Sequence, residues 1–175
     1  MGPVRDMSLP PRSAIPMFYY AMFGIYEPLM VVGGLVGAIM DPVRTHNAQA
    51  PWPVYSPPPP ELPAASIVTV IQLAHVCSLI GLVNYLVLTA VRRHLSTQLA
   101  VQEKIVRALL TPLLIGDVLH IVLTLWALGD TRWDFARWTG MLWATVVLGL
   151  GLLAPRLAWH MGVGRYVHER DGRLL

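Results

Sequence analysis

Two carboxylic acids lie inside long apolar runs of this sequence: Glu27 in FGIYEPLMVVGG and Asp117 in LLIGDVLHIVL. The chain has 10 Asp and Glu residues, and we place the other acids in loops or tails. An ionisable side chain at bilayer depth is costly, and it normally faces a bundle interior or a wet cavity. Glu27 and Asp117 therefore mark the candidate functional site.

A pair of carboxyls in one apolar cavity can perform acid/base chemistry. Two neighbouring carboxyls in a low-dielectric site do not both ionise readily, so they hold one proton between them. One member is then a general acid and the other a general base. Such a pair suits epoxide opening, carbocation cyclisation and double-bond isomerisation. The sequence leaves open which acid takes which role.

Other polar and aromatic residues have spacings that place them near the two acids. His120 follows Asp117 by three residues and shares its helical face. Gln72, His75 and Ser78 are spaced by three and form one stripe on another helix. We predict Glu27, Asp117 and His120 as catalytic residues, and the following as substrate-binding residues: Gln72, His75, Ser78, Asn84, Tyr20 and Phe23.

Three other interpretations use the same residues. A buried carboxyl can simply hydrogen-bond a histidine of the next helix and hold a bundle together. Histidine and carboxylate ligands suit Zn or Fe, but the chain lacks His-x-x-x-His and Glu-x-x-His pairs. We therefore expect neither a metal nor an organic cofactor. A proton relay is not expected either, because we see no further buried charge.

The elements that must position these residues are four apolar runs, which we delimit as 15–40, 64–91, 104–128 and 138–159. Each run is long enough, at about 1.5 Å per residue, to cross a hydrocarbon core of about 30 Å. The chain is 55% apolar and only 13% charged. We predict an all-α bundle of four transmembrane helices over 15–160, between a disordered segment 1–14 and a basic cytoplasmic tail 161–175.

The basic residues are distributed unevenly between the two sides of such a bundle. With four spans, the termini and the second loop share one side and carry most of the Lys and Arg residues. The positive-inside rule then places both termini in the cytoplasm. The net charge of +3 thus reflects topology, and no nucleic-acid partner is expected. We expect a multi-pass protein of the endoplasmic reticulum, in contact with membrane lipid.

Two further segments affect how the bundle assembles. The loop 41–63, which this topology places in the lumen, contains four consecutive prolines, a stiff and extended sequence. It is either a spacer or a lid over the mouth of the bundle. Gly33 and Gly37 form a Gly-x-x-x-Gly pair, which allows another helix to approach closely. That pair serves packing within the bundle or a homodimer.

The strings IYEPLMVVGGLVGAIMDP, VIQLAHV and LLIGDVLHIV resemble a family of small fungal integral membrane proteins of secondary metabolism. The shared motifs are an acid followed by proline, a glutamine in the second helix and Asp-x-x-His in the third. Members accompany polyketide pathways to polyene pyrones of the aurovertin and citreoviridin kind. The resemblance implies a cofactor-independent epoxide hydrolase or cyclase acting on epoxidised polyenes. It implies functional roles for Glu27, Asp117 and His120, with Gln72 in support.

Two other function classes fit the same pattern. The distribution of the acids is also similar to that of the longer membrane-bound terpene cyclases, and the general design to sterol isomerases. Such enzymes need a drier and more aromatic cavity, whereas the stripe of Gln72, His75 and Ser78 favours a wet one. A lipid- or sterol-binding protein would need the cavity but not the titration of the acids.

Overall fold

The computed structural model describes residues 13–172, and these residues form helices joined by loops, without a strand. Four helical spans are long and apolar enough to cross a membrane, which confirms the predicted multi-pass all-α fold. The elements are α1 (Met17–Tyr20), η1 (Ala21–Tyr26), α2 (Glu27–Met40), α3 (Pro42–Asn47), α4 (Ala64–His94), α5 (Leu99–Ala127), η2 (Gly129–Trp133), η3 (Phe135–Arg137), α6 (Gly140–His160) and α7 (His168–Asp171).

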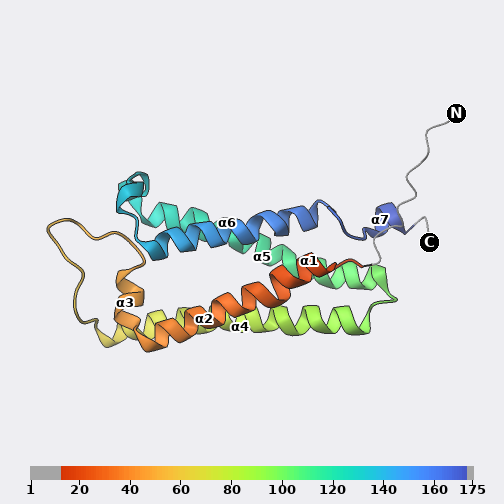
Figure 1. Ribbon diagram of the computed structural model, residues 1–175, viewed down its shortest axis with the longest axis horizontal. Coiled ribbons are helices and arrows are strands. Elements are labelled where there is room, and N and C mark those ends of the chain that lie inside the picture. The colour runs from red at the N-terminus through yellow and green to blue at the C-terminus, as the bar shows by residue number, and fades with distance from the viewer. Residues whose placement is uncertain (1–12, 173–175) are drawn as a thin grey trace.

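The bundle consists of two helical hairpins that meet at one end (Figure 1). The first span packs along α4, and α5 packs along α6. The two pairs lie apart near the 41–63 loop and converge near α1 and α7. The main buried cluster lies at the converging end and includes Phe23, Leu88, Leu110 and Trp159. This end is therefore where side chains from all four spans come together.

The first span, Met17–Met40, is continuous but changes its helical type in the middle. Residues 21–26 form a π-helix, in which the backbone N–H of Glu27 donates to the carbonyl of Met22, five residues earlier. The wide turn ends at Tyr26, two residues before Pro28, which cannot donate a backbone hydrogen bond. Such π-turns are rare and often occur at functional sites. Here the π-turn sets the direction of the Glu27 side chain.

Gly81 of α4 permits the close contact between α4 and α2. A Cβ at this position would lie 3.1 Å from the Cα of Pro28 and would overlap the Val31 side chain. Ser78, one turn earlier on α4, donates to the carbonyl of Val31 at 3.0 Å. The first hairpin is thus fixed by a small residue and one interhelical hydrogen bond, both typical of membrane helices.

We predict that Gly81→Leu separates α2 from α4 and lowers the stability of the bundle. The added side chain cannot fit without moving the backbone of Pro28, and such overpacking typically costs about 1–3 kcal/mol. Thermal unfolding of the purified protein in detergent measures this loss. Gly116→Leu is the matched control, because a Cβ at Gly116 meets nothing within 4 Å. Equal stability of the two variants would contradict the predicted role of Gly81.

The proline-rich loop 41–63 folds back across the open end of the two hairpins. It begins with α3, where the Asp41 side chain accepts from the backbone N–H of Arg44 at 2.9 Å. Arg137 donates to the carbonyl of Trp52, and Thr139 donates to the carbonyl of Ala48. The loop is therefore a bridge between the first span and the start of α6, and it does not extend as a detached spacer.

The helix boundaries differ from the predicted ones at the converging end. The third span begins at Leu99, not at residue 104, and the second continues to His94. These added turns are stabilised by contacts with the chain ends. Ser13 and Ala14 are ordered and bind Gln102, although we predicted disorder for 1–14. The rest of that predicted segment, 1–12, lies outside the described residues.

Candidate functional site

Arg156 of α6 joins the two intramembrane acids. Its Nη2 donates to Oε2 of Glu27 at 2.6 Å, and its Nη1 donates to Oδ2 of Asp117. The Arg156 side chain is 0% exposed, and the two carboxyls are largely buried. The guanidinium of Arg156 thus lies between Glu27 and Asp117 and binds both. We call these three residues the buried triad.

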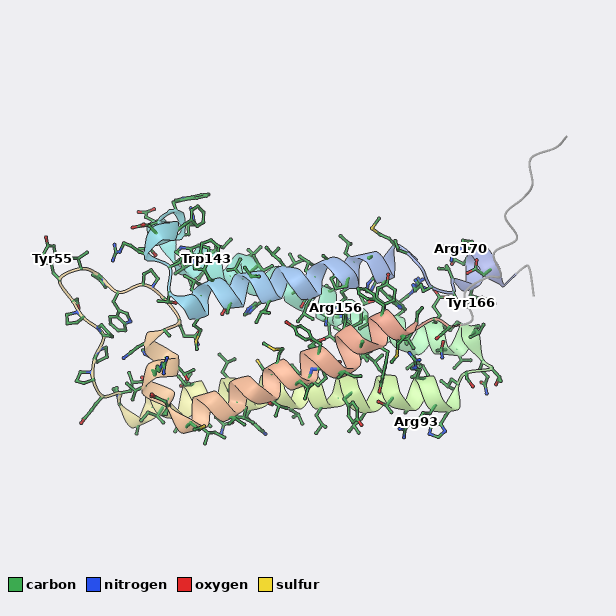
Figure 2. The ribbon with its side chains drawn as sticks, viewed as in Figure 1. Tyr55, Arg93, Trp143, Arg156, Tyr166 and Arg170 are labelled. Carbon is green, nitrogen blue, oxygen red and sulfur yellow. The ribbon has the colours of Figure 1, made fainter. Side chains whose placement is uncertain are left out.

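Helix direction explains why residues at different positions along their spans can meet. A helical side chain leans toward the N-terminus of its own helix. Glu27 and Asp117 belong to spans that run away from the converging end, so their side chains lean back toward it. Arg156 belongs to α6, which runs the opposite way, so its side chain reaches deeper into the bundle (Figure 2). Because the side chains tilt in opposite directions, the guanidinium of Arg156 meets the carboxyls of Glu27 and Asp117.

The groups around the triad come from the first, second and third spans. The Phe23 ring lies under the guanidinium, with the Arg156 Cζ 5.0 Å from the ring centroid. Stacking on an aromatic face and bidentate binding of carboxylates are preferred contacts of arginine. The fully buried Asn84 approaches Glu27 but does not reach hydrogen-bond geometry. His120 lies beside Asp117, against Gly149 of α6.

Several polar atoms of this site lack protein partners among residues 13–172. They are both side-chain polar atoms of Asn84 and the Nε of Arg156, all completely buried. Arg156 uses one oxygen of each carboxyl and leaves Oε1 of Glu27 and Oδ1 of Asp117 for other partners. Buried polar groups normally have hydrogen-bond partners. The site therefore has the donors and acceptors to hold a polar ligand group or water.

The charge balance of the triad favours one retained proton. With both acids ionised the three groups carry a net charge of −1, and with one acid protonated they are neutral. An uncompensated charge is expensive in a low-dielectric site. The neutral arrangement contains one carboxylate and one carboxylic acid, both bound by Arg156. Arg156 thus lies between the two carboxyls, for which we predicted a direct pair.

The structure does not bring all the predicted residues to the triad. Gln72 and His75 are exposed on α4, so these two predicted substrate-binding residues do not join the triad. Ser78 is buried, but it bonds the backbone of the first span. Tyr20 bonds Thr89 of α4. Phe23, Asn84 and His120 do lie near the triad.

The position of Tyr20 has a clear physical cause. Regular α-helical spacing places Tyr20 and Phe23 on the face of Glu27, as predicted. The π-turn contains an additional residue, so it rotates the residues before it relative to those after it. Phe23, within the turn, stays beside Glu27, whereas Tyr20 is turned toward α4. Its ring then lies over Gly24, where a Cβ would be 2.9 Å from the ring.

Arg156 is the functional candidate that the sequence interpretation missed. It lies inside the run 138–159, where we expected no further buried charge. The available signal was an ionisable residue within an apolar run, the same signal that identified the two acids. Pro155, directly before Arg156, is a second signal in the sequence. Proline inside a membrane helix frees a carbonyl that other groups must satisfy.

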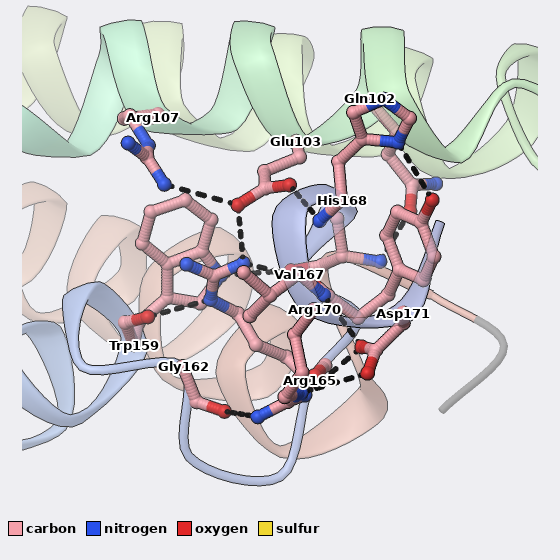
Figure 3. A network of polar contacts seen from close by, with 12 residues as sticks. Gln102, Glu103, Arg107, Trp159, Gly162, Arg165, Val167, His168, Arg170 and Asp171 are labelled. Atoms are coloured by element: carbon pink, nitrogen blue, oxygen red, sulfur yellow. Dashed lines mark hydrogen bonds and ion pairs between the residues drawn. The ribbon is translucent and has the colours of Figure 1, made fainter. Parts of the chain in front are cut away.

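A second polar network closes the converging end of the bundle (Figure 3). Arg165, only 1% exposed, donates to Glu103 at 2.8 Å and packs over Trp159, its Cζ 4.0 Å from the centroid. The backbone N–H of His168 donates to the other oxygen of Glu103 at 2.7 Å. We call this arrangement of the tail on α5 the C-terminal clasp. The predicted basic tail is therefore a folded part of the domain over its described length.

Charge pairing also orders the end of the tail. Arg170 donates to both carboxylate oxygens of Asp171, and these hydrogen bonds hold the pKa of Asp171 below its ordinary value of 3.8. Because the pKa of Asp171 is lowered in the folded state, its carboxylate stabilises the folded tail fully at pH values above 3.8. This contribution disappears only as the pH falls through the lowered pKa. The tail is therefore held by Asp171 at every pH near neutrality.

We predict that Glu103→Gln opens the clasp without disturbing the buried triad. The change leaves Arg165 buried without its carboxylate, and a lost charge-assisted hydrogen bond costs about 1.5–3 kcal/mol. Tryptic cleavage after Arg165 and Arg170 should accelerate roughly tenfold or more, because cleavage follows the open population. Glu169→Gln, at an exposed neighbouring position, is the control. Equal cleavage of both variants would show that Glu103 does not hold the tail.

A family model described as Domain of unknown function (DUF7704) matches residues 12–166, which include every member of the triad. No curated protein and no solved structure matches the chain.

Proposed function

The chain belongs to the DUF7704 family, and we propose from the geometry of its buried triad that it is a membrane-bound epoxide hydrolase or cyclase. The observation that carries this proposal is the guanidinium of Arg156 between Glu27 and Asp117. It holds two carboxyls at a fixed separation in an apolar bundle, with a charge balance that favours one proton. The resemblance to small fungal membrane proteins of polyene pyrone pathways supports the choice of epoxides.

The proposed reaction uses the two carboxyls in opposite roles. Asp117, which lies beside His120 and is the less buried carboxyl, takes a proton from water or from an internal hydroxyl. That oxygen attacks one epoxide carbon, and the C–O bond at this carbon breaks. Glu27 gives its proton to the departing epoxide oxygen, which becomes a hydroxyl. The product is a diol from water or a cyclic ether from an internal hydroxyl.

The triad must then return to its starting state. After one turnover Asp117 carries the proton and Glu27 is ionised, so the net charge of the triad is unchanged. A proton transfer from Asp117 to Glu27, through water, restores the resting state. Arg156 binds whichever carboxyl is ionised and keeps both in place. His120 acts as a positioning residue for the water. The reaction requires no external oxidant, reductant or cofactor.

Label incorporation tests the proposal. Membranes containing the protein are incubated in ¹⁸O-water with a polyene epoxide, a terpenoid epoxide and a fatty-acid epoxide. We expect a diol with one labelled oxygen, or an unlabelled cyclic ether where the substrate carries a suitable hydroxyl. Membranes without the protein give the background. Absence of conversion above background for every epoxide would refute the proposal and favour the isomerase or lipid-binding alternative.

The orientation and cellular location belong to the same proposal. We propose that both termini face the cytoplasm and that the protein resides in the endoplasmic reticulum, where lipophilic substrates partition into the bilayer. The excess of Lys and Arg near the termini and the second loop supports this orientation. A glycosylation acceptor inserted in the proline run 57–60 should be modified, whereas one inserted after residue 96 should not. The reverse pattern of glycosylation would show that both termini face the lumen.

A further inference from the structure

A cavity lies at the converging end, outside the triad. It has a volume of about 250 Å³ and is lined by Met17, Tyr20, Thr89, Arg92 and Arg93. It lies between the first turn of the first span and the last turns of α4. The proposed reaction uses none of these residues, although Tyr20 was expected at the catalytic site.

The polar groups of this cavity are fixed by one another. The Tyr20 hydroxyl and the Thr89 hydroxyl are 3.0 Å apart, and the Arg92 Cζ lies 5.0 Å from the centroid of the Tyr20 ring. Arg92 also donates from Nη1 to the carbonyl of Ile15 at 3.4 Å. Tyr20 and Arg92 are thereby held in place, and the guanidinium retains further N–H donors. The wall of the cavity is therefore preorganised for an acceptor-rich ligand.

The two arginines of this cavity carry charges that the described residues do not neutralise. Within residues 13–172, ion pairs form at Arg107, Arg137, Arg156, Arg165 and Arg170, and none includes Arg92 or Arg93. Arg93 is exposed near the end of α4 (Figure 2) and lines the cavity together with Arg92. Two adjacent cations beside two hydroxyls form a site for a phosphate, whose oxygens accept hydrogen bonds from both kinds of donor.

The surroundings of the cavity identify the source of the phosphate. Met17 and Phe18, at the start of the first span, are each 61% exposed. A helix end with exposed apolar side chains next to arginines lies at the level of lipid headgroups. Basic pockets between membrane helices at this level bind anionic headgroups. We propose that this cavity binds the phosphate of an anionic lipid, with the acyl chains along Met17 and Phe18.

Lipid retention in native mass spectrometry tests this site on the full-length protein. The probes are phosphatidic acid and phosphatidylcholine with identical acyl chains. We expect preferential retention of phosphatidic acid. Arg92→Gln/Arg93→Gln should weaken its binding about 25-fold, since each basic residue contributes a factor of about five. Lys104→Gln removes an exposed charge outside the cavity and should change binding by less than about twofold.

Three results would overturn the proposal. An equal loss in Lys104→Gln would indicate diffuse surface attraction only. Displacement of phosphatidic acid by glycerol 3-phosphate at equal concentration would indicate a site for free phosphate. Arg93→Gln alone also tests the site without risk to the fold, because Arg93 is exposed and makes no side-chain hydrogen bond among residues 13–172. We expect about a fivefold loss, and unchanged binding in that variant would refute the site.

Discussion

Arg156→Gln is expected to abolish epoxide opening and to destabilise the bundle by about 3–5 kcal/mol, the usual cost of removing one partner from a buried ionic group. The guanidinium is completely buried and is the cation between Glu27 and Asp117. Without it, the carboxyls lose their shared partner in an apolar environment. Thermal unfolding in detergent measures the loss of stability, and formation of the labelled diol measures activity.

Two further variants separate stability from chemistry at Arg156. Arg44→Gln removes an exposed arginine and should leave both stability and activity unchanged. A triple variant, Glu27→Met, Asp117→Leu and Arg156→Met, replaces the triad by apolar side chains. Such replacements are often neutral or stabilising, so this variant should be folded but inactive. An Arg156→Gln protein with wild-type stability and activity would contradict the assigned role of the triad.

Asp117→Asn and Glu27→Gln are each expected to lower turnover by about 10²–10⁴-fold, the usual contribution of a general acid or base. Both changes keep the shape of the side chain and remove its capacity to exchange a proton. The effect should fall on kcat and leave KM nearly unchanged, because the carboxyls act on the reacting atoms. Initial rates of diol formation over a range of epoxide concentrations measure both constants.

The control for these two variants is Asp130→Asn, the same chemical change at an exposed position after α5. It should behave as the wild type. A binding protein that does not use proton transfer would tolerate all three substitutions and would still bind its ligand. Loss of folding in Asp117→Asn would instead assign the acid a structural role. Near-wild-type turnover in either Asp117→Asn or Glu27→Gln would contradict the acid/base mechanism.

Much of the fold could be predicted because the dominant signal is simple. Four long apolar runs have only one economical structure in a bilayer, since every backbone group must be bonded within its own helix. The two acids stood out for the same reason: each is an ionisable side chain in an otherwise apolar run. These inferences require only the local sequence.

What the sequence did not predict depends on contacts between segments far apart in the chain. The π-turn before Pro28 rotates Tyr20 away from Glu27, and regular helical spacing cannot anticipate it. We predicted Glu103 in a loop, but α5 begins at Leu99 and includes it. Glu103 binds Arg165 of the tail, a contact that exists only in the folded chain. Arg156 was missed because it lies near the end of its apolar run, as the basic residues that flank a membrane helix do.

The relation between the two acids was therefore only half predicted. Their spans run in the same direction, and Glu27 and Asp117 each lie well inside an apolar run. Helix rotation decides whether such residues face each other, and rotation depends on packing against the remaining helices. The prediction lacked a residue on α6, the antiparallel helix whose side chains tilt in the opposite direction. Arg156 supplies it and joins the carboxyls across three helices.

The most direct test of the central claim is a double-mutant cycle on diol formation in ¹⁸O-water, using Glu27→Gln, Asp117→Asn and the combined variant. Residues that act as one catalytic unit show strongly non-additive losses. If Arg156 couples the carboxyls into one acid/base site, the combined variant should be no slower than the slower single variant. Losses that multiply in the combined variant would show that Glu27 and Asp117 act independently, which would contradict the proposed mechanism.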